Sequence, residues 1–232
     1  MRRLRSLMSG GAPLPVSLVR QYHEAGIVLQ QGFGMSEAAP GIAALDRDRA
    51  LAKAGSIGRP LFFMEVRVVD NDNRDLPPGR EGELLIRGPN LMQGYWNRPE
   101  ATAEAFTDGW FHSGDLARMD EEGDLYIVER KKDMYISGGE NVYPAEVENV
   151  LYELPQVGEA AVIGVKDPKW GEVGRAILVL KPGQSMAEGE VLDFLKKRLA
   201  KYKVPRSVVF VDQLPRNAAG KVLKNVLREK YR

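Results

Sequence analysis

The sequence predicts an α/β segment, then a β-rich subdomain, then a small α+β C-terminal domain. Near the N-terminus, apolar residues at helical spacing lead into a short apolar strand and a glycine-containing loop. Short strands separated by turns fill the middle of the chain, and helices alternate with buried strands after Arg130. We therefore expect a first domain over residues 1–129, divided into segments 1–45 and 46–129, and a second domain over residues 130–232.

The first segment reads as a helix, a strand and a loop. In PVSLVRQYHEAG, Val16, Val19 and Tyr22 recur at helical spacing, and Gly26 can end the helix. A strand is expected over residues 27–29, followed by the loop QGFGMSEAAPG. Ligands bind at the carboxyl ends of strands in open α/β sheets, so this loop lies where a binding site is expected.

The second segment is predicted to be mainly strands. MEVRVVD, GELLIRG and GDLYIVE are the three runs that read as strands. One helix interrupts them, because Asn97 can cap it, Pro99 suits its first turn and ATAEAF continues it. Asp108-Gly109 then turns the chain back.

The C-terminal domain is predicted from helices and strands in alternation. Pro144 can open a helix over AEVENVLYEL, and EAAVIGV and RAILVL read as buried strands. Ser185 with Glu188 makes a capping box before the next helix. The strand SVVFVD, the loop LPRNAAGK and a basic amphipathic end complete the chain.

Composition excludes several classes of function. Lys plus Arg number 33 against 32 Asp plus Glu, so no overall field attracts nucleic acid or an anionic membrane. With no cysteine and two histidines, a metal site would depend on carboxylates, which favours Mg²⁺. No apolar run approaches the roughly 20 residues that span a bilayer. We expect a cytoplasmic protein.

The loop QGFGMSEAAP is the first candidate site. Gly32 and Gly34 flank Phe33, and the hydroxyl of Ser36 and the carboxylate of Glu37 follow. These groups suit a phosphate and its Mg²⁺. The alternative is a structural loop with a capping serine, because short glycine motifs often arise by chance.

Asp115 and the basic run after it form the second candidate. Asp115 follows a serine-glycine pair in an expected loop, where it could accept both hydroxyls of a ribose or simply bond within its own turn. Arg130 ends a strand, and its guanidinium could bind ribose or phosphate oxygens. For Lys131 and Lys132 the alternative is a solvated run of charge.

Two loops of the C-terminal domain are the remaining candidates. Gly138 and Gly139 permit positive φ and close backbone approach, which suits a narrow ligand channel and equally a tight turn. Lys221 lies in a loop before a helix, so a flexible segment could carry its ammonium toward an anionic group. A lone lysine near a C-terminus is otherwise ordinary surface.

Taken together, these segments resemble the adenylate-forming acyl-CoA synthetase superfamily over nearly the whole chain. The matching blocks, in order, are SGGAP, GFGMSE, GSIGRP, GELLIRGPNLMQGYWNRPEATAEAF, DGWFHSGDLA, ERKKDMYISGGENVYPAEVE and LPRNAAGK. GYWNRPEAT followed by SGGENVYPAEVE points toward CoA ligases within the superfamily. The resemblance implies a partial adenylate-forming enzyme fold that acts on a carboxylic acid, ATP and CoA.

The resemblance also implies a role for each candidate residue. The adenine of ATP or AMP would be bordered by Gly11, Ala12, Pro13 and Phe33, with Gly34 beside them. Ser36 would contact phosphate, Glu37 would help hold Mg²⁺, and the ribose hydroxyls would be bound by Asp115 and Arg130.

The remaining assignments fall in the C-terminal domain, where Lys132 would be the hinge about which that domain moves. The pantetheine passage of CoA would be lined by Gly138 and Gly139, and Lys221 would stabilise charge in the first step.

The sequence departs from the family pattern at its start. A Ser/Thr/Gly-rich phosphate loop ending in Pro-Lys-Gly is absent, and so is most of the region that forms the acyl pocket. We therefore expect this chain alone to be weak or inactive as an acyl-CoA ligase. Two alternatives stay open: a non-catalytic remnant that binds a nucleotide or a partner, and an adenylation domain that loads a carrier protein.

Overall fold

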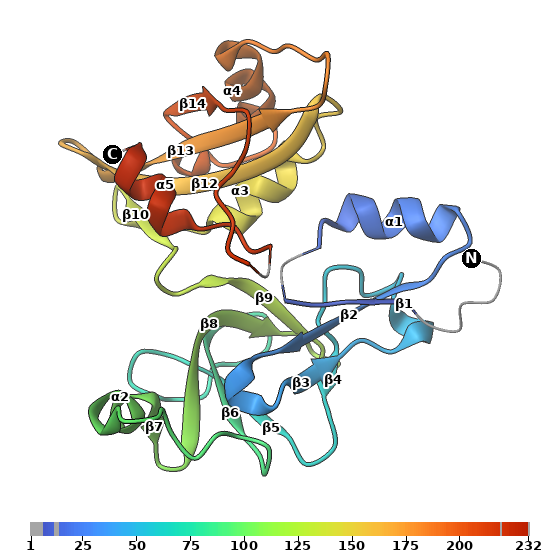
Figure 1. Ribbon diagram of the computed structural model, residues 1–232, viewed down its shortest axis with the longest axis vertical. Coiled ribbons are helices and arrows are strands. Elements are labelled where there is room, and N and C mark those ends of the chain that lie inside the picture. The colour runs from blue at the N-terminus through green and yellow to red at the C-terminus, as the bar shows by residue number, and fades with distance from the viewer. Residues whose placement is uncertain (1–6, 12–13, 219, 232) are drawn as a thin grey trace. The chain divides into compact units, whose positions relative to one another are not determined.

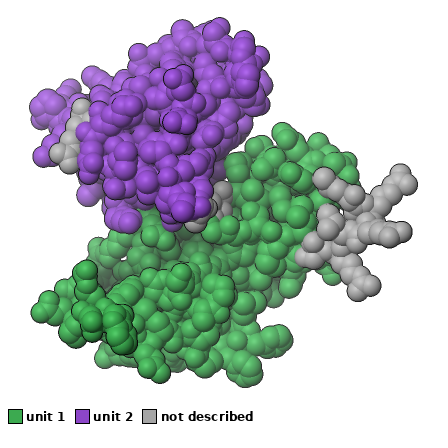
Figure 2. All heavy atoms as spheres, viewed as in Figure 1, with its two compact units in different colours: residues 1–131 green, residues 132–232 purple. Residues whose placement is uncertain are grey.

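The computed structural model describes residues 7–11, 14–218 and 220–231. The chain divides into two compact units, residues 1–131 and residues 132–232, which Figure 2 shows in different colours. Arg130 and Lys131 fall in the first unit, because the strand that ends at Arg130 pairs with a neighbour in that unit. None of the helices in the described ranges combines the length and apolar character that a membrane-crossing helix needs.

The first unit begins with a four-stranded sheet in the order β1-β2-β3-β4 (Figure 1). Its elements are β1 (Leu7–Ser9), α1 (Val16–Glu24), β2 (Leu29–Gly34), the 3₁₀ turn η1 (Ser36–Ala38), β3 (Gly41–Ala44), the 3₁₀ turn η2 (Arg47–Arg49) and β4 (Arg59–Pro60). β1 and β2 are parallel, whereas β2, β3 and β4 are antiparallel. The predicted helix is therefore confirmed, and the strand after it starts later and runs further than expected.

The rest of the first unit is an antiparallel sheet in the order β5-β6-β8-β7, with β9 paired to β8. Its elements are β5 (Glu65–Val69), β6 (Glu81–Arg87), α2 (Pro99–Ala105), β7 (Phe106–Thr107), β8 (Trp110–Met119) and β9 (Leu125–Arg130). One apolar core joins both sheets, since Ile42 of β3 packs in the same buried cluster as Ile86 of β6 and Leu125 of β9. The sites on β2 and β8 therefore share one rigid support.

The start of α2 differs from the prediction. Pro99 is its first residue, as expected, but Arg98 is the residue before it, and Asn97 has a positive φ of 52°. The hydroxyl of Thr102 organises this turn instead, because it accepts from the backbone N–H of Tyr95 at 2.9 Å and donates to the carbonyl of Arg98 at 2.8 Å. Asn97 therefore lies one residue before the N-cap Arg98, in a left-handed conformation.

The second unit is a five-stranded sheet in the order β11-β10-β13-β12, with β14 parallel to β13. Its elements are β10 (Tyr135–Ser137), β11 (Glu140–Val142), α3 (Pro144–Leu151), β12 (Val157–Asp167), β13 (Gly171–Leu180), α4 (Glu188–Lys196), η3 (Lys201–Lys203), β14 (Ser207–Phe210) and α5 (Lys224–Lys230). The predicted strands and helices are present.

Both faces of this sheet are buried. Val162 of β12 packs in one core with Leu151 of α3 and Leu195 of α4. Its chain neighbour Ile163 points to the opposite core, where Leu227 of α5 lies. Successive residues of a strand face opposite sides, which explains why β12 and β13 read as continuous apolar runs.

The capping box predicted before α4 was assigned to the wrong residues. The helix begins at Glu188, and the carboxylate of Glu190 accepts from the backbone N–H of Ala187 at 2.7 Å. Glu188 does not reach back to Ser185, because its carboxylate accepts from the N–H of Val208 in β14 at 2.8 Å. A tertiary contact has therefore taken over the side chain that the local pattern assigned to the cap.

Candidate functional site

The first candidate segment is a strand and a 3₁₀ turn where the sequence predicted a loop. Phe33 and Gly34 end β2 and pair with β3, and Ser36 and Glu37 form the turn η1. Gly34 is needed at its position, because an added Cβ would lie 1.9 Å from the carbonyl oxygen of Pro40. The close hairpin β2–β3 thus presents Ser36, which is exposed, and Glu37, which is half-buried, beyond the strand end.

Glu37 is fixed from two directions. Its carboxylate accepts from the hydroxyl of Tyr95 at 3.1 Å, and its backbone carbonyl accepts from the N–H of Met92 at 2.7 Å. Burial, and then the neighbouring Glu37, raise the pKa of Tyr95, so this phenol keeps its proton for the hydrogen bond. Asn90 braces the same turn by donating to the carbonyls of Ala38 and Gly41 at 2.6 and 2.9 Å.

The other residues assigned to the adenine lie after β1. Gly11 has a φ of +84°, a conformation that glycine adopts without strain. Ala12 and Pro13 lie outside the described residues.

Asp115 lies within strand β8, where the sequence predicted a loop. On the neighbouring strand β6, Glu83 pairs with Leu116 and Leu85 pairs with His112, so three residues of β8 lie opposite Leu84 alone. This is a bulge, and bulges redirect side chains. The hydroxyl of Ser113 donates to the carbonyl of Leu84 at 2.6 Å, and Gly114 supplies the required positive φ of 68°.

Asp115 and Arg130 form an acid–guanidinium pair in which the carboxylate is buried. They stand opposite each other on β8 and β9, and Nε of Arg130 lies 3.0 Å from Oδ1 of Asp115. Asp115 is only 3% exposed, whereas 39% of the Arg130 side chain is accessible. The pair therefore places a fixed carboxylate behind a guanidinium that reaches solvent.

Lys131 and Lys132 differ in their surroundings, although the sequence treats them as one run. Nζ of Lys131 donates to Oε2 of Glu83 at 2.9 Å, so this lysine belongs to an ion pair on the sheet. His112 joins the same carboxylate, with Nδ1 at 3.4 Å from Oε2. Lys132 is exposed and makes no side-chain hydrogen bond or ion pair within the described part of the chain.

Gly138 and Gly139 form the two-residue turn between β10 and β11. Their φ values are +62° and +89°, which match the turn type that glycine favours in tight hairpins. The N–H of Gly138 donates to the carbonyl of Trp170 at 2.9 Å, and a Cβ on Gly138 would lie 2.8 Å from the Trp170 ring. The glycine loop is therefore rigid and in contact with an aromatic side chain.

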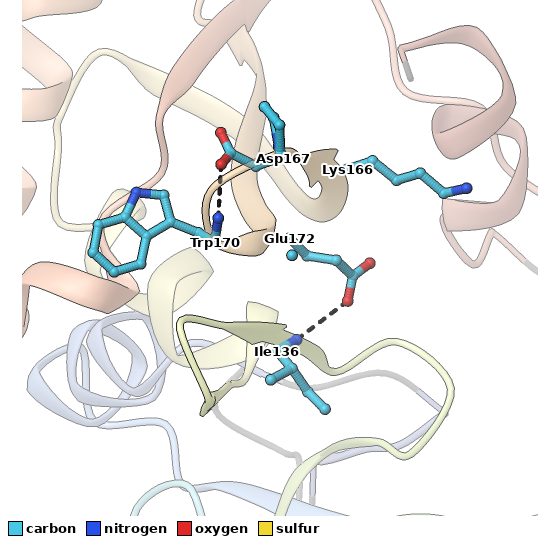
Figure 3. A pocket seen from close by; sticks show the side chains of 7 residues that line it. Ile136, Lys166, Asp167, Trp170 and Glu172 are labelled. Atoms are coloured by element: carbon cyan, nitrogen blue, oxygen red, sulfur yellow. Dashed lines mark hydrogen bonds between the residues drawn. The ribbon is translucent and has the colours of Figure 1, made fainter.

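A surface hollow of about 720 Å³ lies beside this turn (Figure 3). Its lining residues are Ile136, Lys166, Asp167, Pro168, Trp170, Gly171 and Glu172. Asp167 shapes one wall, because its carboxylate accepts from the N–H groups of Trp170 and Lys169, which also lower its pKa. Sequence reasoning missed Trp170, and the signal available was an aromatic residue followed by glycine between two strands.

Lys221 lies on a turn that several hydrogen bonds hold, and the predicted flexibility of this segment stays a prediction. Asn217 and Lys221 exchange two hydrogen bonds, from N–H of Lys221 to Oδ1 of Asn217 at 2.8 Å and from N–H of Asn217 to the carbonyl of Lys221 at 2.9 Å. Arg216 donates to the carbonyl of Gly220 and to the carboxylate of Glu159, each at 2.5 Å. Lys221 itself is exposed.

The predicted residues thus fall into separate groups. The first unit holds the η1 turn with Ser36 and Glu37, and the contact pair Asp115 and Arg130. The second unit holds the glycine hairpin and the Lys221 turn. Among the residues that the structure describes, no group of three or more acidic, histidine or cysteine side chains could hold a metal ion alone.

Comparisons with known proteins agree on one family. The family described as AMP-binding enzyme matches residues 1–96, and the AMP-binding enzyme C-terminal domain matches residues 146–221. A feruloyl-CoA synthase of an Amycolatopsis species is 53% identical over 98% of this chain. The long-chain-fatty-acid–CoA ligase FadD13 of Mycobacterium tuberculosis is 47% identical, also over 98% of this chain.

A solved structure gives the same result. The o-succinylbenzoate CoA synthetase of Bacillus subtilis, in complex with its acyl-adenylate intermediate, matches 97% of this chain with a TM-score of 0.91 and 43% identity. The chain spans about half the length of these proteins: 46% of the feruloyl-CoA synthase, 45% of FadD13 and 46% of the solved structure.

Proposed function

Because the chain belongs to the AMP-binding enzyme family, within the adenylate-forming superfamily, we propose that it is the C-terminal portion of an ATP-dependent, AMP-forming acid–thiol ligase. In the first step a carboxylate attacks the α-phosphate of ATP, and pyrophosphate leaves. In the second step the thiol of CoA attacks the acyl carbon of the acyl-adenylate, and AMP departs. The acid would be a fatty or aryl acid, as in the named relatives.

The observation that carries this proposal is the pair of the buried Asp115 and the partly exposed Arg130. An ionised carboxylate has about four acceptor positions, so Asp115 can accept from Arg130 and from the hydroxyls of a ribose. Its position on a bulged strand, at 3% exposure, fixes it before the nucleotide arrives. Preorganised groups lose less conformational entropy on binding. We assign both residues to the ribose of ATP and AMP.

The η1 turn would hold the phosphates. Ser36 offers an exposed hydroxyl, and Glu37 offers a carboxylate whose position is fixed by Tyr95. Mg²⁺ commonly uses one or two protein carboxylates together with substrate phosphates and waters, so Glu37 fits this ion. When bound, Mg²⁺ would offset the negative charge of the phosphates. Gly11, Phe33 and Gly34 would border the adenine.

The second unit would supply groups for both steps. The ammonium of Lys221 would stabilise negative charge during adenylation, because a cation placed where charge develops lowers the barrier. The turn of Gly138 and Gly139 would line the passage of the pantetheine arm, and the hollow beside Trp170 provides room along that face. Lys132 would be the hinge about which the unit turns between the two steps.

The proposal is tested in a complete protein, made by joining this chain to the preceding part of the 53%-identical feruloyl-CoA synthase. We expect acid-dependent exchange of pyrophosphate into ATP, followed by CoA-dependent release of AMP, with a panel of fatty and aryl acids. The 232-residue chain alone should form little or no acyl-CoA. Asp115→Asn should raise the KM for ATP roughly tenfold or more, because a hydrogen bond to a charged group contributes about 1.5–3 kcal/mol.

The alternatives make different predictions in the same assays. A non-catalytic remnant would bind AMP but support no exchange with any acid. An adenylation domain that loads a carrier would show exchange, yet would transfer the acyl group to a carrier phosphopantetheine and not to free CoA.

The cellular location is a further part of the proposal. ATP and CoA as substrates support a cytoplasmic location, and fractionation of the source cells would test it.

A further inference from the structure

The residues on either side of Lys132 are fastened to different units. On the side of the first unit, the backbone N–H of Lys131 donates to the carbonyl of Gly114 at 2.9 Å, and Nζ donates to Glu83 at 2.9 Å. The Glu83 side chain is only 12% exposed. Lys131 is therefore held to the sheet by its backbone and by its side chain.

Asp133 is fastened in a corresponding way within the second unit. Nη2 of Arg228, on helix α5, donates to Oδ1 of Asp133 at 2.8 Å and lies 3.4 Å from the Asp133 carbonyl oxygen. The two side chains are 28% and 13% exposed. Two residues further on, Tyr135 is buried in the core of the unit. The second unit therefore holds the chain from Asp133 onward.

We infer that Glu83 and Arg228 are positioning residues that confine rotation between the units to the short backbone stretch around Lys132, between the Cα atoms of Lys131 and Asp133. This inference rests on the proposed function, in which that rotation separates the two steps. Turning about φ of Lys131 would pull its side chain away from Glu83 while its N–H stays on Gly114. Turning about ψ of Asp133 would move its carbonyl oxygen away from Arg228. Turning about ψ of Lys131, about φ or ψ of Lys132, or about φ of Asp133 breaks none of these contacts. The Lys132 side chain also has no hydrogen-bond or ion-pair partner in the described ranges. A narrow pivot limits the orientations that the second unit can adopt.

We call the pairs Glu83–Lys131 and Arg228–Asp133 the two clamps. In the first clamp, neighbouring cations keep the carboxylate of Glu83 ionised. Burial alone would raise the pKa of Glu83, but Lys131 and His112 outweigh it, so the pKa lies below its usual value. Glu83 is therefore ionised at neutral pH, and the pair with Lys131 is intact. Removing the carboxylate leaves Lys131 with only its backbone bond. Partly exposed pairs of this kind contribute modestly, so the expected effect is looser rotation and not unfolding.

The test measures the spread of distances between the units. The chain has no cysteine, so Glu104→Cys on α2 and Lys197→Cys after α4, both exposed, provide the sole attachment points for two spin labels. Double electron–electron resonance should give a limited distribution in the parent chain. Glu83→Gln and Arg228→Met should each broaden it, and the double variant should broaden it most. Amide exchange at Lys131 should become about two- to fivefold faster in Glu83→Gln.

Matched control variants distinguish the effect of losing a clamp from the effect of losing any other ion pair. Glu65→Gln removes a similar pair in the first unit, Glu65–Arg87 at 2.5 Å, and Arg198→Met removes Arg198–Glu153 at 3.1 Å in the second. Neither control should change the distribution. Lys131→Arg should keep it narrow, whereas Lys131→Met should broaden it. Circular dichroism spectra of all variants should match the parent.

Two outcomes would overturn the inference. One is a distribution that stays the same in the clamp variants, and the other is a parent distribution already as broad as theirs. Neither measurement needs ATP or an acid, so a failure of the proposed chemistry would leave the distances interpretable. In the complete protein, the clamp variants should retain the KM for ATP and should slow turnover of the two-step reaction.

Discussion

Lys221 illustrates how single residues are positioned by their neighbours in this chain. The turn that carries it is closed by Asn217 and by Arg216, which bridges the carbonyl of Gly220 and the carboxylate of Glu159. A guanidinium can donate in two directions at once, which a lysine ammonium does less well because it lacks the fixed fork. The backbone that carries the Lys221 side chain is therefore held by these hydrogen bonds.

A substitution at Lys221 should separate the two proposed steps. In the complete protein, Lys221→Ala should abolish ATP–pyrophosphate exchange but spare the transfer of a supplied acyl-adenylate to CoA, because the cation is assigned to the first step only. Lys197→Ala, which removes an exposed lysine on the same unit, serves as the control. Unchanged exchange in Lys221→Ala would refute the assignment.

Residue-level reasoning from the sequence identified the types of group but not their settings. Asp115 was expected in a loop, and the bulge that places it in β8 depends on the register between β6 and β8. Glu83 and Tyr95 were not singled out, because their importance comes from partners 48 and 58 residues away in the chain. Contacts of that range leave no local pattern.

At the scale of elements, a charged network fastens the β8–β9 turn to the segment before β4. Lys53 donates to Asp120 at 2.8 Å and to Glu122 at 2.6 Å, and Arg49 contacts the buried Asp124. Asp120 also accepts from the N–H groups of Glu122 and Asp124. Burial would raise the pKa of Asp120, but Lys53 and these N–H groups lower it to about 2.

This pKa predicts how stability depends on acid. The folded value of about 2 is below the value of about 3.9 for an unfolded chain, so the contribution of Asp120 is complete above pH 4 and disappears as the pH falls toward 2. Asp120→Asn should lower the Tm at pH 7, and the difference from the parent should shrink between pH 4 and pH 2. Asp72→Asn, in an exposed turn, is the control. A difference that does not depend on pH would contradict the linkage.

The glycine hairpin allows a sharper comparison between neighbouring positions. Gly138→Ala and Gly139→Ala both place a side chain at positive φ, which costs roughly 1–2 kcal/mol. An added Cβ meets the Trp170 ring at 2.8 Å only at Gly138, whereas nothing lies within 4 Å at Gly139. Gly138→Ala should therefore lose more stability in urea and should alter Trp170 fluorescence. Equal losses would show that the ring moves aside easily.

Element types were largely predictable, whereas starts and ends were not. Apolar periodicity identified α3, β12 and β13 because their buried faces are long and regular. The segment of β8 was read as loop, since its glycine, serine and aspartate residues have low strand propensity and sheet pairing overrides that preference. The start of α4 was misplaced because Glu188 bonds to β14.

For the whole molecule, the division into two units has an energetic consequence. The second unit has an apolar core on each face of its sheet, with α3 and α4 covering one face and α5 the other. Arg175 strengthens the second core by donating to the hydroxyl of Ser207 and to the carbonyl of Tyr231. All these contacts lie within residues 132–232, so the unit does not depend on the first for its core.

Residues 132–232 should therefore fold when expressed alone. We expect a cooperative thermal transition by circular dichroism, with a Tm close to that of the same unit within the 232-residue chain, because its buried surface is internal. Leu151→Ala, at a fully buried position, should destabilise the fragment by about 2–5 kcal/mol, whereas Lys197→Ala should have little effect. A fragment without a cooperative transition, or one indifferent to Leu151→Ala, would show that the core is completed by other parts of the protein.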